Sequence, residues 1–107
     1  MTSLQKVSFQ KILACVIRFR RAIVSVSSNI VEGFEKNNNN EFVRFLKIAK
    51  GSAGETRNQL YISLAVAYIS QHEFDVINTK LEDLAGQIGG FIVYLQRKKE
   101  NKEFLKK

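Results

Sequence analysis

The side chains that could carry out catalysis are few and lie far apart in the sequence. Ser25, Ser27 and Ser28 supply hydroxyl groups, and the single histidine, His72, follows much later. Hydrolysis by a serine requires a base and an orienting group in the same cleft. We expect His72 to lie in the first turn of a helix beside Glu73, facing solvent, where it is unsuited to act as that base. The sequence therefore predicts a protein that is not an enzyme.

Metal-binding patterns are also missing from the sequence. One histidine and one cysteine do not form the usual zinc ligand sets. Carboxylate pairs occur at Glu32/Glu35 and at Glu82/Asp83, without the Glu-x-x-His spacing of di-iron bundles. Cys15 has apolar neighbours and no second cysteine to pair with, so we expect a buried, inert thiol. The chain is predicted to hold no metal, no cofactor and no small-molecule substrate.

Positive charge is the clearest functional signal. The chain has 17 Lys and Arg against 10 Asp and Glu, a formal net charge of +7. Such an excess favours polyanionic partners, with nucleic acid first among them. The candidate contacts are Lys11, Arg18 and Arg21, then Arg44, Lys47, Lys50 and Arg57, and finally Arg97, Lys98 and Lys99. We expect electrostatic, shape-led binding, since no sequence-reading motif accompanies these residues.

Two alternatives remain open for these cations. They can be ordinary solvated faces of helices, which is the usual role of charge runs. They can also serve an acidic protein partner, in which case the chain is a structural oligomer or an accessory subunit without nucleic-acid binding.

Apolar residues repeat in steps of three and four along most of the chain. This spacing places them on one side of a helix, as in antiparallel bundles. It predicts three long helices, at about 4–34, 39–68 and 71–98. The residues of the three stripes are Phe9, Ile12, Val16, Phe19, Ile23, Val26 and Ile30; Phe42, Leu46, Ala49, Ala53, Thr56 and Leu60; and Phe74, Ile77, Leu81, Leu84, Ile88, Phe91 and Leu95.

Polar residues mark where these helices begin. Asn38 with Glu41, and Ser70 with Glu73, have the spacing of capping boxes. We expect Gly33 to end the first helix in a left-handed conformation. Short connections between long rods enforce an antiparallel arrangement. The prediction is an all-α, up-and-down helical bundle in a single domain, 1–107, with a basic tail at 99–107.

The small residues Gly51, Ser52, Ala53 and Gly54 lie in the middle of the second helix. Glycine within a helix is destabilising by about 1 kcal/mol relative to alanine. We interpret this turn as the point where a neighbouring helix crosses closely. A phosphate-binding glycine loop is disfavoured because no strand precedes it and no Gly-Lys-Ser/Thr follows.

Targeting signals are not visible in the sequence. The N-terminus lacks the pattern of a secretory signal. The longest apolar-rich window, 60–69, is about half the length that a membrane span requires. We therefore expect a cytoplasmic protein without membrane association.

The chain resembles the bacterial four helix bundle protein family, which includes proteins encoded in intervening sequences of 23S rRNA genes. The resemblance lies in the stretches 19–33 and 41–46, and in shorter matches up to 70. Carried over residue by residue, the matching positions are Arg20, Arg21, Ser28, Asn29, Glu32 and Gly33; Glu41, Phe42, Arg44, Phe45 and Leu46; and Gly51, Ser52, Glu55, Gln59 and Leu60.

The resemblance implies a four-helix bundle that assembles as a homopentamer. A distant relative is the accessory protein of diversity-generating retroelements, a basic pentamer that works with nucleic acid, so the resemblance favours RNA as the polyanion. Two departures matter. Family members usually have a further helix before the arginine pair, so we expect three helices here. Either one long first helix replaces the family's first two, or the first helix is missing and leaves an apolar groove that a partner subunit covers. Ala67 occupies a position where the family commonly has glycine, which makes a left-handed turn there harder.

A separate polar set lies close to the first two apolar stripes. Asn29 is next to Ile30, Glu32 lies near the edge of the stripe, and Glu55 follows the small-residue turn. We favour an inter-helix hydrogen-bond network that fixes the register of the helices. The alternative is an RNA-contact or ligand site that includes Arg21.

Overall fold

The computed structural model consists of three long α-helices joined by two short connections. They are α1 (Ser3–Glu35), α2 (Asn39–Ala65) and α3 (Gln71–Leu105). The structure describes the backbone of residues 3–105 and the side chains of residues 9–99. The helices therefore lie where the periodicity placed them, and the prediction of an all-α bundle is confirmed. Of the predicted tail at 99–107, the backbone is helical to Leu105, and its side chains after Lys99 lie outside the described residues.

Side-chain caps begin α2 and α3 as predicted. The Asn38 Oδ1 accepts a hydrogen bond from the Glu41 backbone N–H at 3.1 Å. At α3 the capping box is complete: the Ser70 hydroxyl accepts from the Glu73 N–H at 3.1 Å, and the Glu73 carboxylate accepts from the Ser70 N–H at 2.9 Å. These bonds satisfy backbone donors that a helix start leaves without partners.

The prediction that Gly33 ends the first helix is wrong. Helix α1 continues to Glu35, and no described glycine has a positive φ. Asn37 takes the left-handed conformation instead, with φ 52°, and its N–H reaches the Phe34 carbonyl at 3.4 Å. Asparagine is one of the few residues besides glycine that adopt this conformation readily.

Gly33 has a packing role instead. It is buried, and a Cβ built on it would lie 2.7 Å from the Phe45 Cβ and 3.1 Å from the Phe42 Cδ1. A Cβ is essentially never found that close to another atom. The glycine therefore allows α1 and α2 to approach closely near their shared corner.

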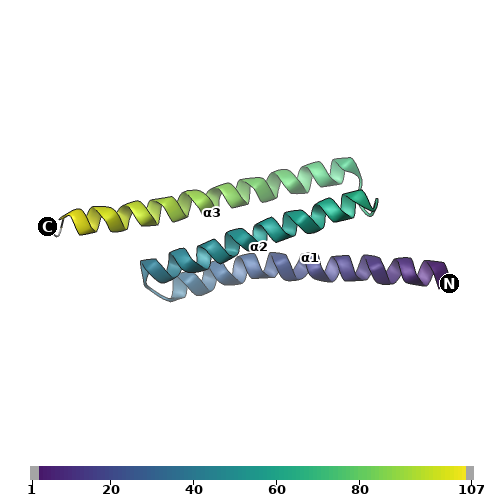
Figure 1. Cartoon of the computed structure of the whole chain (residues 1–107), viewed down its shortest axis with the longest axis horizontal. Helices are drawn as coiled ribbons and strands as arrows, with labels where there is room; N and C mark the ends of the chain where they lie inside the picture. The colour runs from purple at the N-terminus through teal and green to yellow at the C-terminus, as the bar shows by residue number, and fades with distance from the viewer. Residues whose placement is uncertain (1–2, 106–107) are drawn as a thin grey trace.

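Helix α2 is the centre of the molecule. It packs against both α1 and α3, whereas no Cα atoms of α1 and α3 lie within 8 Å of each other. Figure 1 shows the three rods nearly antiparallel, with α1 extending past the α2–α3 corner at the N-terminal end. The Cα extents are 72 × 25 × 13 Å, and the radius of gyration is 18.4 Å. A compact domain of this size would have a radius near 13 Å. The chain is thus an open, elongated layer of three helices.

Two hydrophobic clusters hold this layer together. The first joins Val26 of α1 to Leu46, Ala49 and Ala53 of α2 and to Ile88 of α3. The second lies near the α2–α3 corner and contains Leu60, Phe74 and Leu81. A row of aromatic rings crosses the layer, since Phe34 of α1 contacts Phe42 of α2, and Phe42 contacts Phe91 of α3.

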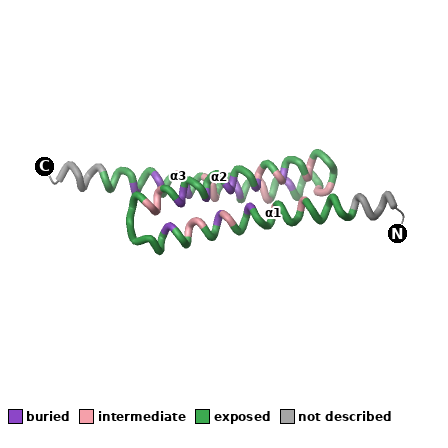
Figure 2. Tube along the Cα trace, turned by 60° about the horizontal axis from the view of Figure 1, so that its bottom comes forward, coloured by how far each residue is buried: buried purple, intermediate pink, exposed green. Residues whose placement is uncertain are grey.

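The predicted stripes of α2 and α3 form most of the core, although Phe91 of α3 is 40% exposed. The stripe of α1 contributes only in part. Leu46, Ala49, Ala53, Thr56 and Leu60 are all buried. In α1, Val26 is buried and Ile30 half-buried, but the stripe is exposed at Phe9, Ile12, Val16 and Ile23. Figure 2 shows this division, with the buried positions of α1 confined to its C-terminal half. The first half of the stripe is covered only in part: Phe19 packs on the second cluster, and Ile12 and Val16 line an apolar pocket beside Leu60 of α2.

The small-residue turn of α2 was predicted to mark a close crossing with a neighbouring helix, and its two glycines do not take part in one. Ser52 and Ala53 are buried, but a Cβ at Gly51 or Gly54 would meet nothing within 4 Å. The close approach therefore uses Ser52 and Ala53. Gly51 and Gly54 are exposed, and no packing contact within this chain requires a glycine at either position.

Candidate nucleic-acid interface

Basic side chains of α2 and of the C-terminal part of α3, which belong to two of the predicted groups of cations, lie along the junction of these helices. Lys50 lies across α3, with its Nζ 3.3 Å from the position a Cβ on Gly89 would take. Lys47 and Lys99 line one hollow between the two helices. Arg57 reaches α3 further along the same junction. We call Lys47, Lys50, Arg57 and Lys99 the α2–α3 basic seam.

The hollow at one end of this seam is polar, and none of the described residues that line it is acidic. It has a volume of about 550 Å³ and is lined by Asn39, Asn40, Val43, Lys47, Leu95, Gln96 and Lys99. A second hollow beside it is lined by Asn37, Asn38, Asn39, Asn40 and Lys99. The asparagine run thus brings the start of α2 beside the basic end of α3. Backbone N–H groups at a helix start and lysine side chains both favour anions.

Two of the predicted arginines are held by partners within the chain. The Arg57 guanidinium donates from Nε to the Asn78 side-chain oxygen and from Nη2 to the Glu82 carboxylate, each at 3.0 Å. The Arg44 Nη2 donates to the Glu41 carboxylate at 3.0 Å. Hydrogen bonding to Arg44 is the main reason that the pKa of Glu41 lies below its ordinary value. The charge of both arginines is therefore offset locally, which leaves Lys47 and Lys50 as the main cations of α2.

The remaining predicted cations are not gathered into the seam. Lys11, Arg18 and Arg21 are exposed on α1, whose Cα atoms all lie more than 8 Å from those of α3. Arg97 and Lys98 are exposed on α3 beside Lys99 and do not line the hollow. The ten predicted residues thus occupy at least two separate surfaces of one chain.

The polar contacts between α1 and α2 are centred on two serines. The Ser25 and Ser52 hydroxyls lie 2.8 Å apart, and the Asn29 amide donates to the Ser25 carbonyl at 2.7 Å and to its hydroxyl at 3.1 Å. Asn29 therefore reaches α2 only through Ser25. Glu32 and Glu55 are exposed and make no hydrogen bond or ion pair with any described side chain. The network in the structure contains Asn29 but neither carboxylate.

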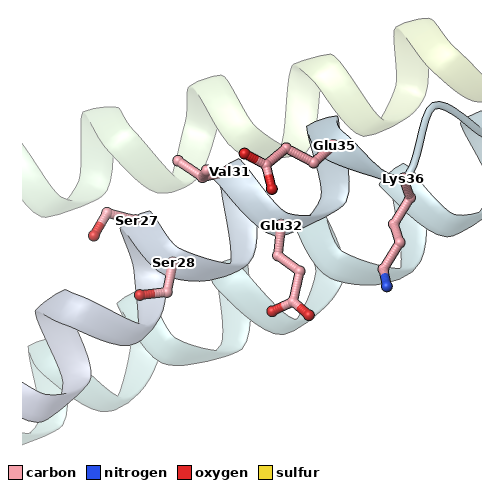
Figure 3. A pocket seen from close by; sticks show the side chains of 6 residues that line it. All are labelled: Ser27, Ser28, Val31, Glu32, Glu35 and Lys36. Carbon is pink, nitrogen blue, oxygen red and sulfur yellow. The ribbon is translucent and has the colours of Figure 1, made fainter.

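A large hollow on the described surface follows the last turns of α1. It has a volume of about 670 Å³ and is lined by Ser27, Ser28, Val31, Glu32, Glu35 and Lys36. Figure 3 shows these side chains pointing in different directions from one helix and the start of the turn that follows it. One helix face does not enclose a ligand, and the side chains do not converge on a point. The arrangement lacks the grouped nucleophile and base that serine chemistry requires.

Other catalytic and metal-binding arrangements are likewise not found in the described part of the chain. No group of three or more His, Cys, Asp and Glu residues there could hold a metal ion. His72 is exposed next to Glu73, as expected. Cys15 is half-buried rather than fully buried and lines an apolar pocket between α1, α2 and the α2–α3 corner. Among the described helices, none has the length and apolar character needed to cross a bilayer.

Two features of these sites were not anticipated from the sequence. Of the four asparagines, only Asn38 was assigned a role, as a helix cap, yet all four line a hollow beside Lys99. The contact of Ser25 with Ser52 was also missed, although each lies beside a residue of an apolar stripe. Spacing indicates which residues share a helix face, but the pairing of faces from different helices depends on the register of the bundle.

The comparisons with known proteins give one positive result. A sequence model of the 23S rRNA-intervening sequence protein family matches residues 3–90. No curated protein and no solved structure matches the chain. The matched region begins in α1, includes all of α2 and continues into α3. Because the match spans well over half of the 107 residues, the chain belongs to the 23S rRNA-intervening sequence protein family.

Proposed function

We propose that this protein is a non-catalytic scaffold that binds structured RNA through the α2–α3 basic seam. Lys47 and Lys50 make the principal phosphate contacts, and Lys99 and the asparagines at the start of α2 extend the contact surface. Binding is electrostatic and depends on the shape of the RNA, because the seam contains lysines and amides rather than a base-reading aromatic platform.

The observation that carries this proposal is the composition of the hollow at the end of the seam. Among the residues whose side chains the structure describes, its polar lining consists of three amides and two lysines, without a carboxylate. An ordinary solvated surface of a chain with 10 acidic residues would be expected to mix both signs. The net charge of +7 also attracts a polyanion such as RNA at long range. RNA is preferred over DNA because of the family name and the resemblance alone.

We further propose that the protein acts as a homo-oligomer, a pentamer if it follows the resemblance. The support within the chain is the apolar outer side of α1, where Val24 and Val31 are 59% and 55% exposed. Repeating the seam in several subunits would give a continuous basic band. Multi-angle light scattering measures the oligomeric state directly, and a stable monomer would overturn this part of the proposal.

The RNA proposal is tested by mobility shifts with a structured RNA. The variant Lys47→Glu/Lys50→Glu should weaken binding roughly tenfold or more, because two phosphate contacts become repulsive. The matched control is Lys36→Glu/Lys80→Glu, which changes the net charge equally and lies outside the seam. The control should bind almost as well as the natural chain at moderate salt, where distant charges are screened.

Two results would contradict the proposal. One is the absence of any shift of the natural protein at low salt. The other is an equal loss of binding in both double variants, which would assign the affinity to net charge rather than to the seam. Circular dichroism spectra confirm that each variant remains helical.

A further inference from the structure

Four aromatic rings form a row across the layer, near the start of α2. Phe34 of α1 contacts Phe42 of α2 with ring centroids 6.1 Å apart, and Phe42 contacts Phe91 of α3 at 5.3 Å. The row ends at Tyr94, whose ring centroid lies 6.0 Å from that of Phe91. Phe42 is half-buried, whereas Phe34, Phe91 and Tyr94 are 71%, 40% and 57% exposed. Adjacent exposed rings of this kind indicate an interaction surface.

The Phe91 and Tyr94 rings form a pair that suits a flat ligand. Their planes are 12° apart, so a flat molecule that lies on one ring is nearly parallel to the other. Tyr94 is next to Leu95, which lines the polar hollow of the α2–α3 basic seam. Figure 1 shows this part of α3 beside the start of α2. The pair is therefore close to the seam along α3.

Helix geometry places the pair and the polar hollow on different sides of α3. At about 3.6 residues per turn, Tyr94 and Gln96, which lines the hollow, lie on nearly opposite sides of the helix. Arg97 lies between them, on the outer edge that faces away from the buried Leu95. A stiff duplex on the seam does not follow this curve, whereas a flexible single strand that passes over Arg97 does.

Two cations lie next to the ring pair. Arg97 and Lys98 follow Tyr94 by three and four residues, so they are its neighbours on the helix surface. Both are exposed, and neither makes an ion pair or a hydrogen bond with a side chain of residues 9–99. A nucleotide offers a flat base with a phosphate attached. Proteins bind single-stranded nucleic acid through this combination of aromatic rings and cations.

The apolar surface at the ring pair is too short for a helix of another protein to pack along α3. Gln87 precedes Phe91 by four residues and Lys98 follows it by seven, so polar side chains occupy the next position in each direction. Both are exposed. A helical partner requires an apolar stripe that continues over several turns. One or two bases need only the single turn that Phe91 and Tyr94 provide.

We propose that Phe91 and Tyr94 stack unpaired bases of an RNA whose paired part lies on the α2–α3 basic seam. Arg97 and Lys98 contact the phosphates of these unpaired nucleotides. The inference rests on the proposed function and gives it a substrate class, namely a duplex that continues into a single strand. Because every base has a flat face, this contact accepts any sequence.

The test uses the full chain and two labelled RNA hairpins with the same paired stem. One hairpin continues into a short single-stranded extension. In the other, every nucleotide of the extension is abasic, so that it keeps the ribose and phosphate and lacks the base. The two RNAs carry the same number of phosphates, so the electrostatic contribution is equal in both. Fluorescence anisotropy should show the first RNA binding at least about fivefold more tightly, with a ratio that changes little with salt.

Substitutions at Tyr94 separate stacking from simple apolar contact. Tyr94→Phe keeps a flat ring and should keep the preference for the extension with bases. Tyr94→Leu keeps an apolar side chain without the ring and should lose most of that preference. The matched control is Tyr61→Leu, at a tyrosine that is 50% exposed and contacts Phe74 near the α2–α3 corner, and it should keep the preference. Circular dichroism reports whether each variant folds.

Failure of this inference is distinguishable from failure of the proposed function. If neither RNA binds the natural chain at low salt, both are wrong. If the two RNAs bind equally, the proposed function stands and only the stacking is wrong. An equal loss of preference in Tyr61→Leu and Tyr94→Leu would also overturn the stacking. So would a lower oligomer mass of Tyr94→Leu in light scattering, which would assign the ring pair to a contact between copies.

Discussion

Among the described residues other than glycine, two have a left-handed backbone, and both follow the end of a helix. Asn37, with φ 52°, follows α1, and Ala67, with φ 61°, follows α2. At the end of α2 the Tyr68 N–H donates to the Ser63 carbonyl at 2.8 Å, and the Ala67 N–H donates to the Leu64 carbonyl at 3.0 Å. This pair of bonds is the Schellman motif, whose left-handed position is usually glycine. The turn that the sequence predicted to be difficult for alanine is thus made by alanine.

Replacing Ala67 by glycine should stabilise the protein. A left-handed conformation costs an L-residue about 1–2 kcal/mol, and the additional freedom of glycine in the unfolded chain offsets part of that gain. We expect Ala67→Gly to raise the free energy of unfolding by about 1 kcal/mol in urea titrations. The matched control is Ala65→Gly in the last turn of α2, which should lower it by a similar amount. A loss of stability in Ala67→Gly would contradict the assigned backbone conformation.

Gly33 and Gly54 should respond to the same substitution in opposite directions. A Cβ at Gly33 would overlap that of Phe45, so Gly33→Ala should lower the free energy of unfolding by about 1–3 kcal/mol. A Cβ at Gly54 meets nothing within 4 Å, so Gly54→Ala should raise it by about 1 kcal/mol through helix propensity. Thermal unfolding of the two variants checks both expectations. Equal effects of the two changes would show that α1 and α2 are not as close at Gly33 as described.

The starts of α2 and α3 show how well the helix boundaries could be predicted from the sequence. Both caps were predicted from the spacing of Asn38 with Glu41 and of Ser70 with Glu73, because these contacts are local. The end of α1 was predicted wrongly, because Gly33 was taken as a helix stop although its role is in a long-range contact. Gly33 is needed where α1 touches Phe45 of α2, and sequence spacing alone does not distinguish that role from a helix stop.

The capping box of α3 should make part of the stability depend on pH. Hydrogen bonds from the Ser70 backbone N–H, and then from its side chain, hold the pKa of Glu73 below its ordinary value of 4.5. Because the pKa is lowered in the folded state, this contribution is complete above the unfolded value and is lost as the pH falls through the folded value.

Glu73→Gln keeps an acceptor in the capping box but removes this titration. Between pH 6 and pH 3, roughly the range in which carboxylates titrate, the stability of Glu73→Gln should fall less than that of the natural chain. Urea midpoints at several pH values measure the difference. Parallel curves for the two proteins would contradict the assigned role of Glu73.

At the scale of the whole molecule, the open arrangement of the helices explains both the correct and the missed predictions. The stripes of α2 and α3 were identified as core because helices of this chain cover them. The stripe of α1 is just as regular in sequence, yet Phe9 is 56% exposed. Periodicity shows which side of a helix is apolar and does not show whether a partner is present.

The candidate interface was predictable only in part for the same reason. Charge and spacing identified Lys47, Lys50 and Lys99, but not that the end of α3 lies beside the asparagine run. That juxtaposition depends on the antiparallel register of α2 and α3. Arg44 and Arg57 were chosen on the same grounds. The pairing of Arg57 with Glu82 depends on that register, whereas the pairing of Arg44 with Glu41 is a local contact within α2.

The salt dependence of RNA binding tests the central proposal most directly. Each phosphate contact adds a nearly fixed amount to the slope of log affinity against log salt concentration, because counterions are released from the RNA. With a structured RNA, the natural chain should bind at low salt and show a steep negative slope. Lys47→Gln/Lys50→Gln should make that slope shallower by about two contacts for each chain that touches the RNA, whereas Lys36→Gln/Lys80→Gln should leave it nearly unchanged. A natural chain that does not bind at low salt, or whose slope is the same in all three proteins, would contradict the account.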